Sequence, residues 1–216
     1  MWVVAYLSEA ELERAALPKA ERAALINADA KLGVYGPQLG HPHTSAVRGI
    51  PALRELRPRA GRSPYRALYR QVGEVFVVAA VGPEAVSDQR GFDRAVRQGA
   101  GAALEGGGRL MPRTSELKTS AQIAAEELAD PEIRREHDRT ALAHAVALRV
   151  IGYRVDHGLS QTALARRLGM HQPAIARLEA GEHEPSLAML SRLARSLGVE
   201  FHIDITPDAF ELRDSA

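Results

Sequence analysis

The most constraining stretch of the sequence runs from Leu159 to Gly181, LSQTALARRLGMHQPAIARLEAG, and predicts two short helices joined by a tight turn. Ser160 precedes the first helix, and its hydroxyl can accept one of the unpaired N–H groups at the helix start. Gly169 lies where the chain must turn, because glycine takes positive φ at no steric cost. Pro173 opens the second helix, where its missing N–H costs nothing, and Gly181 ends it. The buried side consists of small and apolar residues at helical spacing: Leu164, Ala165, Leu168, Met170, Ile175 and Leu178.

This spacing resembles the DNA-binding helix-turn-helix of the phage-repressor-like Xre family. An ordinary αα-hairpin also needs Leu, Ala and Gly, so the outward-facing residues decide between the two. Gln and Arg make bidentate contacts to adenine and guanine edges, and Arg also neutralises phosphates. The resemblance implies that Gln172, Ala174 and Arg177 lie near bases in the major groove and that Gln161 meets a phosphate. Arg166 also faces outward and joins the expected DNA-binding set.

The residues around this motif complete an expected C-terminal domain. His171 stands where the Xre family usually has Ser or Thr, which weakens the cap of the second helix. Ser186 caps a last helix that ends at Gly198. Residues 199–205, VEFHIDI, alternate apolar and polar and predict a half-buried strand. In antitoxins of the Xre type such a strand can pair with a second copy, so the resemblance implies a homodimer on a two-half-site operator.

Length and composition bound the class of protein. A chain of 216 residues is long enough for two small domains. The sequence contains no cysteine, which fits a reducing cytoplasm and excludes thiolate metal sites. Residues 2–7, WVVAYL, are too few for a signal peptide or a membrane span and suit a buried strand. We therefore expect a cytoplasmic protein with no membrane partner and no cofactor.

The positive charge of the chain gathers in two places. Residues 44–70 hold seven arginines and one acid, Glu55, for a net charge of +6. Residues 149–181 hold five arginines and two acids, for a net charge of +3. Two basic patches predict two separate contacts with polyanions.

The N-terminal half reads as a small antiparallel sheet with helices. We expect strands at residues 2–7, 53–58, 65–72 and 75–81, and helices at residues 9–17, 19–32 and 91–104. The apolar run at 75–81 marks a central strand that is covered on both faces. His41 and His43 flank a proline, but no third metal ligand stands near them, so no metal site is expected.

The pieces WVV, YGPQLGHPH, RELRPR and YRALY, followed by the apolar strand, resemble a HigB-type toxin over about residues 1–100. HigB-type toxins belong to the RelE-like ribonucleases, which cut messenger RNA on the ribosome. Cleavage by attack of the 2′-OH needs a base, an acid and positive charge at the transition state. The candidates that the resemblance implies are Arg57 and Arg66 for charge stabilisation, Tyr65 and Tyr69 for proton transfer or base stacking, and Arg54 and Arg59 for contacts with the RNA backbone.

One departure from the HigB pattern leaves the activity open. Relatives of this type tend to carry a basic residue, commonly Lys, directly after the apolar strand, where this chain has Gly82, Pro83 and Glu84. An acid there replaces a cation where a phosphate would lie. The toxin-like domain is therefore either an active ribonuclease or a degenerate remnant, and the arginines are alternatively a solvated strand face or a docking surface for the acidic part of the second domain.

The second half resembles a HigA-type antitoxin, so the whole chain resembles a fused toxin–antitoxin pair of the α+β class. The expected domains are 1–105, a glycine-rich linker at 106–111, and 112–216, with the helix-turn-helix at about 140–198. The helical domain is expected to be all-α apart from its terminal strand.

Between these two halves lies an acidic segment. Residues 116–138 hold seven acids and three bases and are expected to be helical, with Glu126 and Glu127 exposed. These acids either mask the ribonuclease surface or face solvent.

Two functions follow from the resemblances. In the first, the C-terminal domain binds its own operator and represses transcription, while the N-terminal domain is a ribosome-dependent mRNA endoribonuclease that the antitoxin part keeps inhibited. In the alternative, the protein is a DNA-binding repressor whose toxin-like domain is inactive or serves only for dimerisation or sensing.

Overall fold

A computed structural model describes residues 1–104, 117–205 and 210–213. It divides into two compact units, Met1–Arg134 and Arg135–Ala216. The predicted linker at 106–111 lies outside the described residues, and residues 117–134 pack within the first unit. The assignment of 112–216 to an antitoxin-like domain stays a prediction. None of the described helices combines the length and apolarity needed to cross a bilayer.

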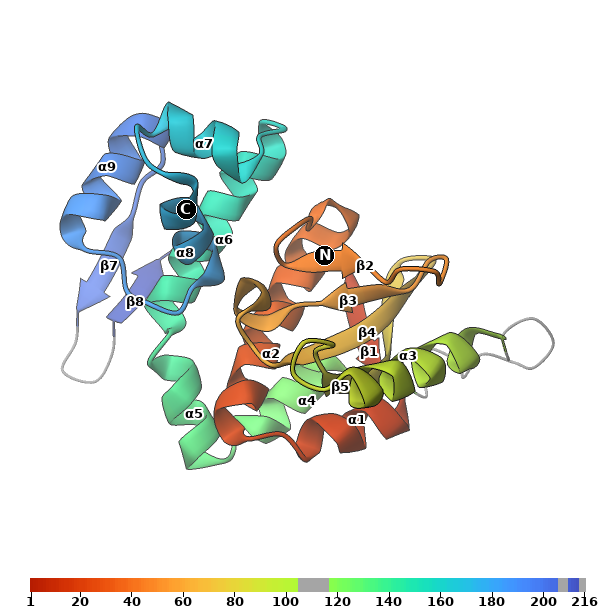
Figure 1. Ribbon diagram of the computed structural model, residues 1–216. Helices are drawn as coiled ribbons and strands as arrows, with labels where there is room; N and C mark the ends of the chain where they lie inside the picture. The colour runs from red at the N-terminus through yellow and green to blue at the C-terminus, as the bar shows by residue number, and fades with distance from the viewer. Residues whose placement is uncertain (105–116, 206–209, 214–216) are drawn as a thin grey trace. The chain divides into compact units, whose positions relative to one another are not determined.

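The first unit is built on a six-stranded sheet (Figure 1). In chain order its strands are β1 (Val3–Tyr6), β2 (Thr44–Ala46), β3 (Arg54–Leu56), β4 (Tyr65–Val72), β5 (Val75–Pro83) and β6 (Lys118–Thr119). They lie in the spatial order β2-β3-β4-β5-β1-β6. β1 pairs parallel with β5, and the other neighbouring strands described pair antiparallel. The predicted α+β class is confirmed, and the apolar strand β5 lies inside the sheet, as its composition predicts.

Helices cover this sheet. The helical elements of the first unit are α1 (Ser8–Ala15), α2 (Lys19–Tyr35), the 3-10 turns η1 (Gly36–Gln38) and η2 (Pro58–Gly61), α3 (Gln89–Leu104) and α4 (Ser120–Glu127). α5 (Pro131–Asp138) follows and spans the boundary between the units. Leu68 and Ala80 pack with Phe92 of α3, whereas Ala23 and Ile26 of α2 pack with residues of α4 and α5. The strands β2 and β6 and the turn η2 were not predicted, because each is too short to show a period in sequence.

The second unit contains the predicted helix-turn-helix. Its elements are α6 (Ala141–Asp156), α7 (Gln161–Arg167), α8 (Gln172–Ala180), α9 (Leu187–Leu197), β7 (His202–Ile205) and β8 (Phe210–Arg213). The Ser160 hydroxyl accepts the N–H of Ala163 at 3.1 Å, whereas His171 makes no side-chain cap, as its residue type predicts. The predicted terminal strand β7 pairs antiparallel with β8 of the same chain. The hairpin partner β8 was not predicted.

The predicted core of the helix-turn-helix is confirmed. Ile175 and Leu164 are fully buried, and Leu190 and Leu193 of α9 complete the cluster. Met170 and Leu178 are partly buried against it. Burial of one side of α7, α8 and α9 fixes which side of α8 remains available to a partner.

Gly169 and Gly181 both adopt left-handed φ, at 59° and 70°, but their surroundings differ. A Cβ on Gly169 would meet no described atom within 4 Å. A Cβ on Gly181 would lie 3.1 Å from the Cα of His144 and 3.3 Å from the carbonyl oxygen of Ala143. Gly181 therefore ends α8 and also allows it to approach α6 closely.

We expect Gly181→Ala to destabilise the second unit more than Gly169→Ala. Both substitutions place Cβ in the left-handed region, which costs about 1 kcal/mol. Gly181→Ala adds a close contact with the backbone of α6, which we expect to bring the cost to about 2 kcal/mol or more. Native-state hydrogen exchange of the α6 amides measures both values. Equal costs for the two variants would contradict the proposed packing role of Gly181.

Candidate nucleic-acid interfaces

A buried polar relay links three helices of the second unit. The guanidinium of Arg154 donates to the Glu179 carboxylate, with Nε 2.7 Å from Oε1 and Nη2 3.2 Å from Oε2. Gln161 donates from Nε2 to Glu179 at 2.9 Å, and its Oε1 accepts from Nε2 of Gln172 at 2.8 Å. A fully buried carboxylate needs such partners, because an unpaired buried charge is strongly unfavourable.

The relay corrects the prediction that Gln161 points outward. Gln161 is buried, and its side chain holds Gln172 instead of extending into solvent. The sequence gives no sign of this, because a glutamine at the first position of a helix is usually solvated. The side chain of Gln172 is thus held at the start of α8 through its Nε2, and its Oε1 takes no part in this relay.

The other predicted DNA-binding residues lie on the outer side of α7 and α8. Arg166 and Arg177 are exposed, and Ala174 is half-buried. Arg167 is also exposed, with its guanidinium carbon 5.3 Å from the centre of the Tyr153 ring. A fixed glutamine, a small residue and an arginine at 172, 174 and 177 form a surface suited to base edges, with Arg166 available to phosphates.

In the first unit, the carboxylate of Glu55 lies between the two arginines predicted for charge stabilisation. Its Oε1 is 3.5 Å from Nε of Arg57, and its Oε2 is 3.8 Å from Nε of Arg66. The side chain of Arg57 is 24% exposed. Its Nε is buried, and no described group accepts a hydrogen bond from it. The structure thus brings Arg57 and Arg66 together, but around an anion.

Arg66 is enclosed by the protein and is only 2% exposed. Its Nη1 donates to the carbonyl oxygens of Ser63 and Tyr65 at 2.5 and 2.7 Å. Its Nη2 donates to the Glu84 carboxylate and to the Gly61 carbonyl oxygen. Burial lowers the pKa of Arg66, Glu84 opposes this effect, and the neighbouring Arg57 adds to it. Glu84 is therefore the ion-pair partner of a buried arginine.

The remaining predicted residues are held by neighbouring elements. Arg59 donates to Glu21 of α2 at 2.5 Å, and Arg54 donates to the Tyr69 hydroxyl at 3.2 Å. Tyr69 is buried edge-on against Phe76, with ring centres 5.5 Å apart, which leaves no face for a stacked base. Tyr65 is half-buried. Arg57 and Tyr65 are thus the candidates best placed to meet a substrate.

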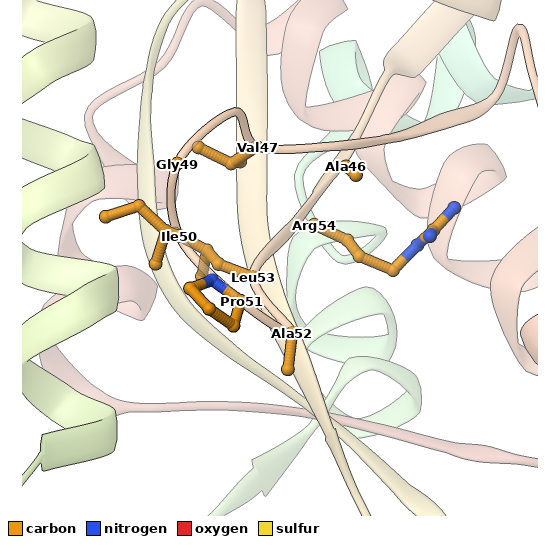
Figure 2. A pocket seen from close by; sticks show the side chains of 8 residues that line it. All are labelled: Ala46, Val47, Gly49, Ile50, Pro51, Ala52, Leu53 and Arg54. Atoms are coloured by element: carbon orange, nitrogen blue, oxygen red, sulfur yellow. The ribbon is translucent and has the colours of Figure 1, made fainter.

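A shallow apolar hollow lies beside β3 (Figure 2). The loop between β2 and β3 forms it, and Figure 2 shows the side chain of Arg54 extending away from this loop. Arg70 donates to the carbonyl oxygen of Pro51 at 3.0 Å. The residues that line the hollow are Ala46, Val47, Gly49, Ile50, Pro51, Ala52, Leu53 and Arg54. Apart from Arg54, the lining offers no side chain able to transfer a proton or bind a phosphate.

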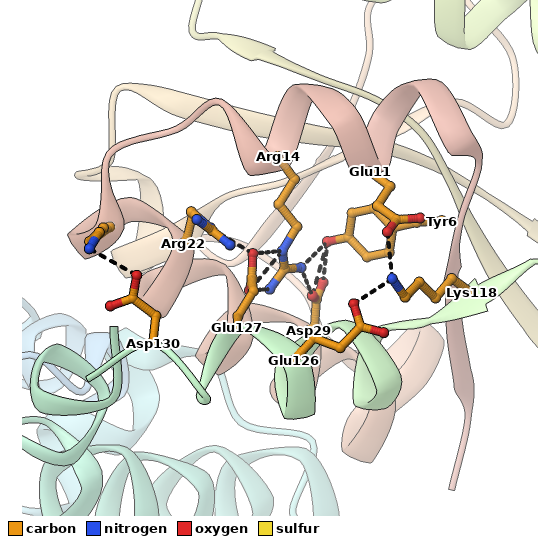
Figure 3. A network of polar contacts seen from close by, with 10 residues as sticks. Tyr6, Glu11, Arg14, Arg22, Asp29, Lys118, Glu126, Glu127 and Asp130 are labelled. Atoms are coloured by element: carbon orange, nitrogen blue, oxygen red, sulfur yellow. Dashed lines mark hydrogen bonds and ion pairs between the residues drawn. The ribbon is translucent and has the colours of Figure 1, made fainter. Parts of the chain in front are cut away.

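A second buried cluster, absent from the sequence analysis, connects β1, α1, α2 and α4 (Figure 3). Arg14 is fully buried and donates to Glu127 and Asp29, with Nη2 2.7 Å and Nη1 2.6 Å from their carboxylates. The Tyr6 hydroxyl donates to Asp29 at 2.9 Å. Burial raises the pKa of Asp29, although Arg14 opposes the shift.

The prediction that Glu127 is exposed was wrong, because its side chain is only 5% exposed. Ile123 and Glu127 stand four residues apart on α4 and therefore share a face. Ala10 and Arg14 do the same on α1. This spacing is the signal that could have found the cluster. Within the described residues, no group of three His, Cys, Asp or Glu is placed to hold a metal ion.

Comparisons with known proteins give one family match in each of the two units. Residues 152–203 match the helix-turn-helix family HTH_3, and residues 13–81 match the family described as phage derived protein Gp49-like (DUF891), a RelE-like toxin family. An uncharacterised HTH-type transcriptional regulator of Methanothermobacter thermautotrophicus is 43% identical over 53 residues, which is 24% of this chain and 77% of the relative. One of Methanocaldococcus jannaschii is 38% identical over 48 residues, which is 22% of this chain and 73% of the relative. No solved structure matches the chain.

We expect Arg66→Met to destabilise the first unit strongly and Arg57→Met to leave its stability nearly unchanged. The first change leaves Glu84 and three carbonyl oxygens without their donor, at a cost of about 3 kcal/mol. The second removes a half-exposed pair, which is worth about 1 kcal/mol or less. Urea unfolding followed by the fluorescence of Trp2, the single tryptophan, reports on this unit. A variant Arg66→Met as stable as Arg57→Met would contradict the structural role of Arg66.

Proposed function

Because the chain belongs to the helix-turn-helix family of transcriptional regulators, we propose that its second unit binds the operator of its own gene as a homodimer and represses transcription. The observation that carries this proposal is the outer side of α8. There the buried relay through Glu179 and Gln161 holds Gln172 in place, and Arg177 is exposed. A side chain fixed before binding loses less conformational entropy when it pairs with a base.

The homodimer is proposed from the usual geometry of such operators, in which two half-sites bind two copies. The β7–β8 hairpin is a two-stranded sheet, and each of its strands has an outer edge that can pair with another chain. Dimerisation through this hairpin is consistent with the pairing expected for the terminal strand.

We expect Gln172→Ala and Arg177→Ala each to weaken specific operator binding by about 1–3 kcal/mol, which is about tenfold to a hundredfold in affinity. Both residues face the expected base edges, so their loss should also relax sequence preference. Fluorescence anisotropy with operator and scrambled duplexes at fixed salt measures affinity and preference together. Arg195→Ala, at an exposed arginine of α9, is the matched control. Unchanged discrimination in both α8 variants would remove the base-contact assignment.

A second function is proposed for the first unit, namely ribosome-dependent cleavage of mRNA that the antitoxin-like part keeps inhibited. The observation that favours it is the partial exposure of Arg57 and its pairing with Glu55. Its side chain is 24% exposed, and Glu55, which lies between it and the buried Arg66, holds its surroundings in place. A partly exposed cation whose surroundings are fixed fits stabilisation of a phosphorane-like transition state, and the half-buried Tyr65 is the candidate for proton transfer. The competing proposal is an inactive toxin-like unit.

We expect residues 1–105, expressed alone, to cut translated mRNA and arrest growth, and Arg57→Ala to lower cleavage about a hundredfold or more. The physical reason is the loss of the partly exposed cation paired with Glu55. Primer extension on a translated reporter measures the cuts, and Trp2 fluorescence checks that the fragment is folded. Arg48→Ala, at an exposed arginine of the same basic patch, is the control. A folded fragment without cleavage would favour the inactive unit and leave DNA binding as the working activity.

A further inference from the structure

Within the first unit, residues 117–134 pack against residues 1–104 as a strand followed by helices. β6 pairs antiparallel with β1, with Thr119 opposite Ala5 and Lys118 opposite Tyr6. Ile123 and Ile133 are buried, and Ile133 packs in one cluster with Ala23 and Ile26 of α2. The contact thus combines main-chain pairing with an apolar seam, which is the usual form of a specific interface.

The acidic residues of this segment have definite partners, and Figure 3 shows those of Glu126 and Glu127. Glu127 accepts from Nη2 of Arg14 at 2.7 Å and from Nε of Arg22 at 2.9 Å. Asp130 and Glu132 each lie 2.8 Å from Nζ of Lys19. Among the described residues, these acids pair with α1 and α2 and not with the arginines of 44–70. The predicted mask over the ribonuclease surface is therefore wrong for these acids.

The buried charges of the docking face are paired with or without the segment. Arg14 and Asp29 form a buried pair inside the first unit, with Nη1 2.6 Å from Oδ2. Glu127 adds one negative charge, and Arg22, which is partly exposed, supplies the matching positive charge. If the segment leaves, Arg22 turns to water and the Arg14–Asp29 pair stays neutral as a whole. Such a face suits a detachable partner, because neither state buries an unpaired charge.

The first turn of α2 connects this face to residues 57–65, which follow β3 and are called the arginine loop below. Lys19 and Arg22 bind the segment, while Glu21, between them, accepts from Arg59 and from the Ser63 hydroxyl at 2.6 Å. The Ser63 carbonyl oxygen in turn accepts from Arg66 at 2.5 Å. One helical turn therefore contacts the segment and the arginine loop at once.

The loop itself needs an outside constraint. Arg59 and Ala60 adopt left-handed φ angles of 52° and 53°, which residues with a Cβ rarely take. Such backbone persists only where surrounding contacts hold it. The contacts of Arg59 with Glu21 and with the Ala20 carbonyl oxygen, at 3.1 Å, are of this kind.

We propose that the face formed by the β1 edge, Arg14, Arg22 and Lys19 is the docking site for residues 117–134 as a detachable inhibitory segment, which controls the arginine loop through the first turn of α2. This inference rests on the proposed ribonuclease function for its biological consequence. β6 and the arginine strand β3 lie on opposite sides of β4, β5 and β1 in the sheet. The segment therefore acts on the arginine loop from the opposite edge of the sheet and does not cover it.

The test is hydrogen exchange on the full chain carrying Glu127→Lys, with Glu126→Gln as the matched control. Glu127→Lys sets a cation against Arg14 and Arg22, whereas Glu126 is exposed and pairs with Lys118 of the segment itself. We expect exchange at least tenfold faster at the amides of β6 and α4, and also at Arg57 and Tyr65 of the arginine loop. The Arg57 amide is protected by the His43 carbonyl oxygen at 2.8 Å. The control should match the unmodified chain.

Two outcomes overturn the proposal: faster exchange in β6 and α4 with an unchanged arginine loop, or no change in either. If Glu127→Lys unfolds the unit, as Trp2 fluorescence would show, Lys19→Glu replaces it. Lys19 is exposed, so this variant repels Asp130 and Glu132 without touching the buried cluster. It is judged by the same two outcomes.

Cleavage of translated mRNA by the same variants separates the two proposals. Faster hydrogen exchange in the arginine loop together with new cleavage supports both the docking control and the ribonuclease. Loop loosening without cleavage overturns the ribonuclease function and leaves the docking control in place. Cleavage with an unchanged loop overturns control through α2 while the ribonuclease stands.

Discussion

The buried network of hydrogen bonds and ion pairs around Arg14 is the interaction on which the first unit depends. It joins residues 113 positions apart in the chain, and Asp29 and Tyr6 complete the set of partners around the guanidinium. Burial lowers the pKa of Arg14, but Tyr6, Asp29 and Glu127 together raise it well above its ordinary value, so it stays charged. Because a buried charge without a partner is strongly unfavourable, Arg14 needs Asp29 as a permanent partner, and Glu127 of the docked helix adds a second one that Arg22 balances.

Acids outside the basic patch decide how much of its charge is free. The count for residues 44–70 includes only Glu55 as an acid. Glu21 and Glu84 lie outside that range in sequence but pair with Arg59 and Arg66 in space. A charge sum along the chain therefore overstates the positive potential that an RNA would meet, and Arg57, which is 24% exposed, carries more of the proposed chemistry than the buried Arg66.

The features predicted best from the sequence are those that depend on residues close together in the chain. The helix-turn-helix follows from side chains four residues apart and from caps and glycines within 23 positions, so spacing alone fixes α7 and α8. The partners of Arg66, Gln161 and Glu127 were missed, since they depend on which strands and helices become neighbours. Strand β8 was also missed, because a strand of four residues shows too little pattern to be identified.

The position of Glu55 sets a condition on any phosphate chemistry in the first unit. A phosphate that approaches Arg57 meets this carboxylate, whose Oε1 already lies 3.5 Å from the arginine Nε. Two anions at one guanidinium repel each other, so a phosphate binds well only when the pair between Arg57 and Glu55 opens. Arg66 stays fixed by its carbonyl partners and Glu84 during such a change. The movable part is therefore the chain around Arg57, which is continuous with the η2 loop that α2 holds through Arg59.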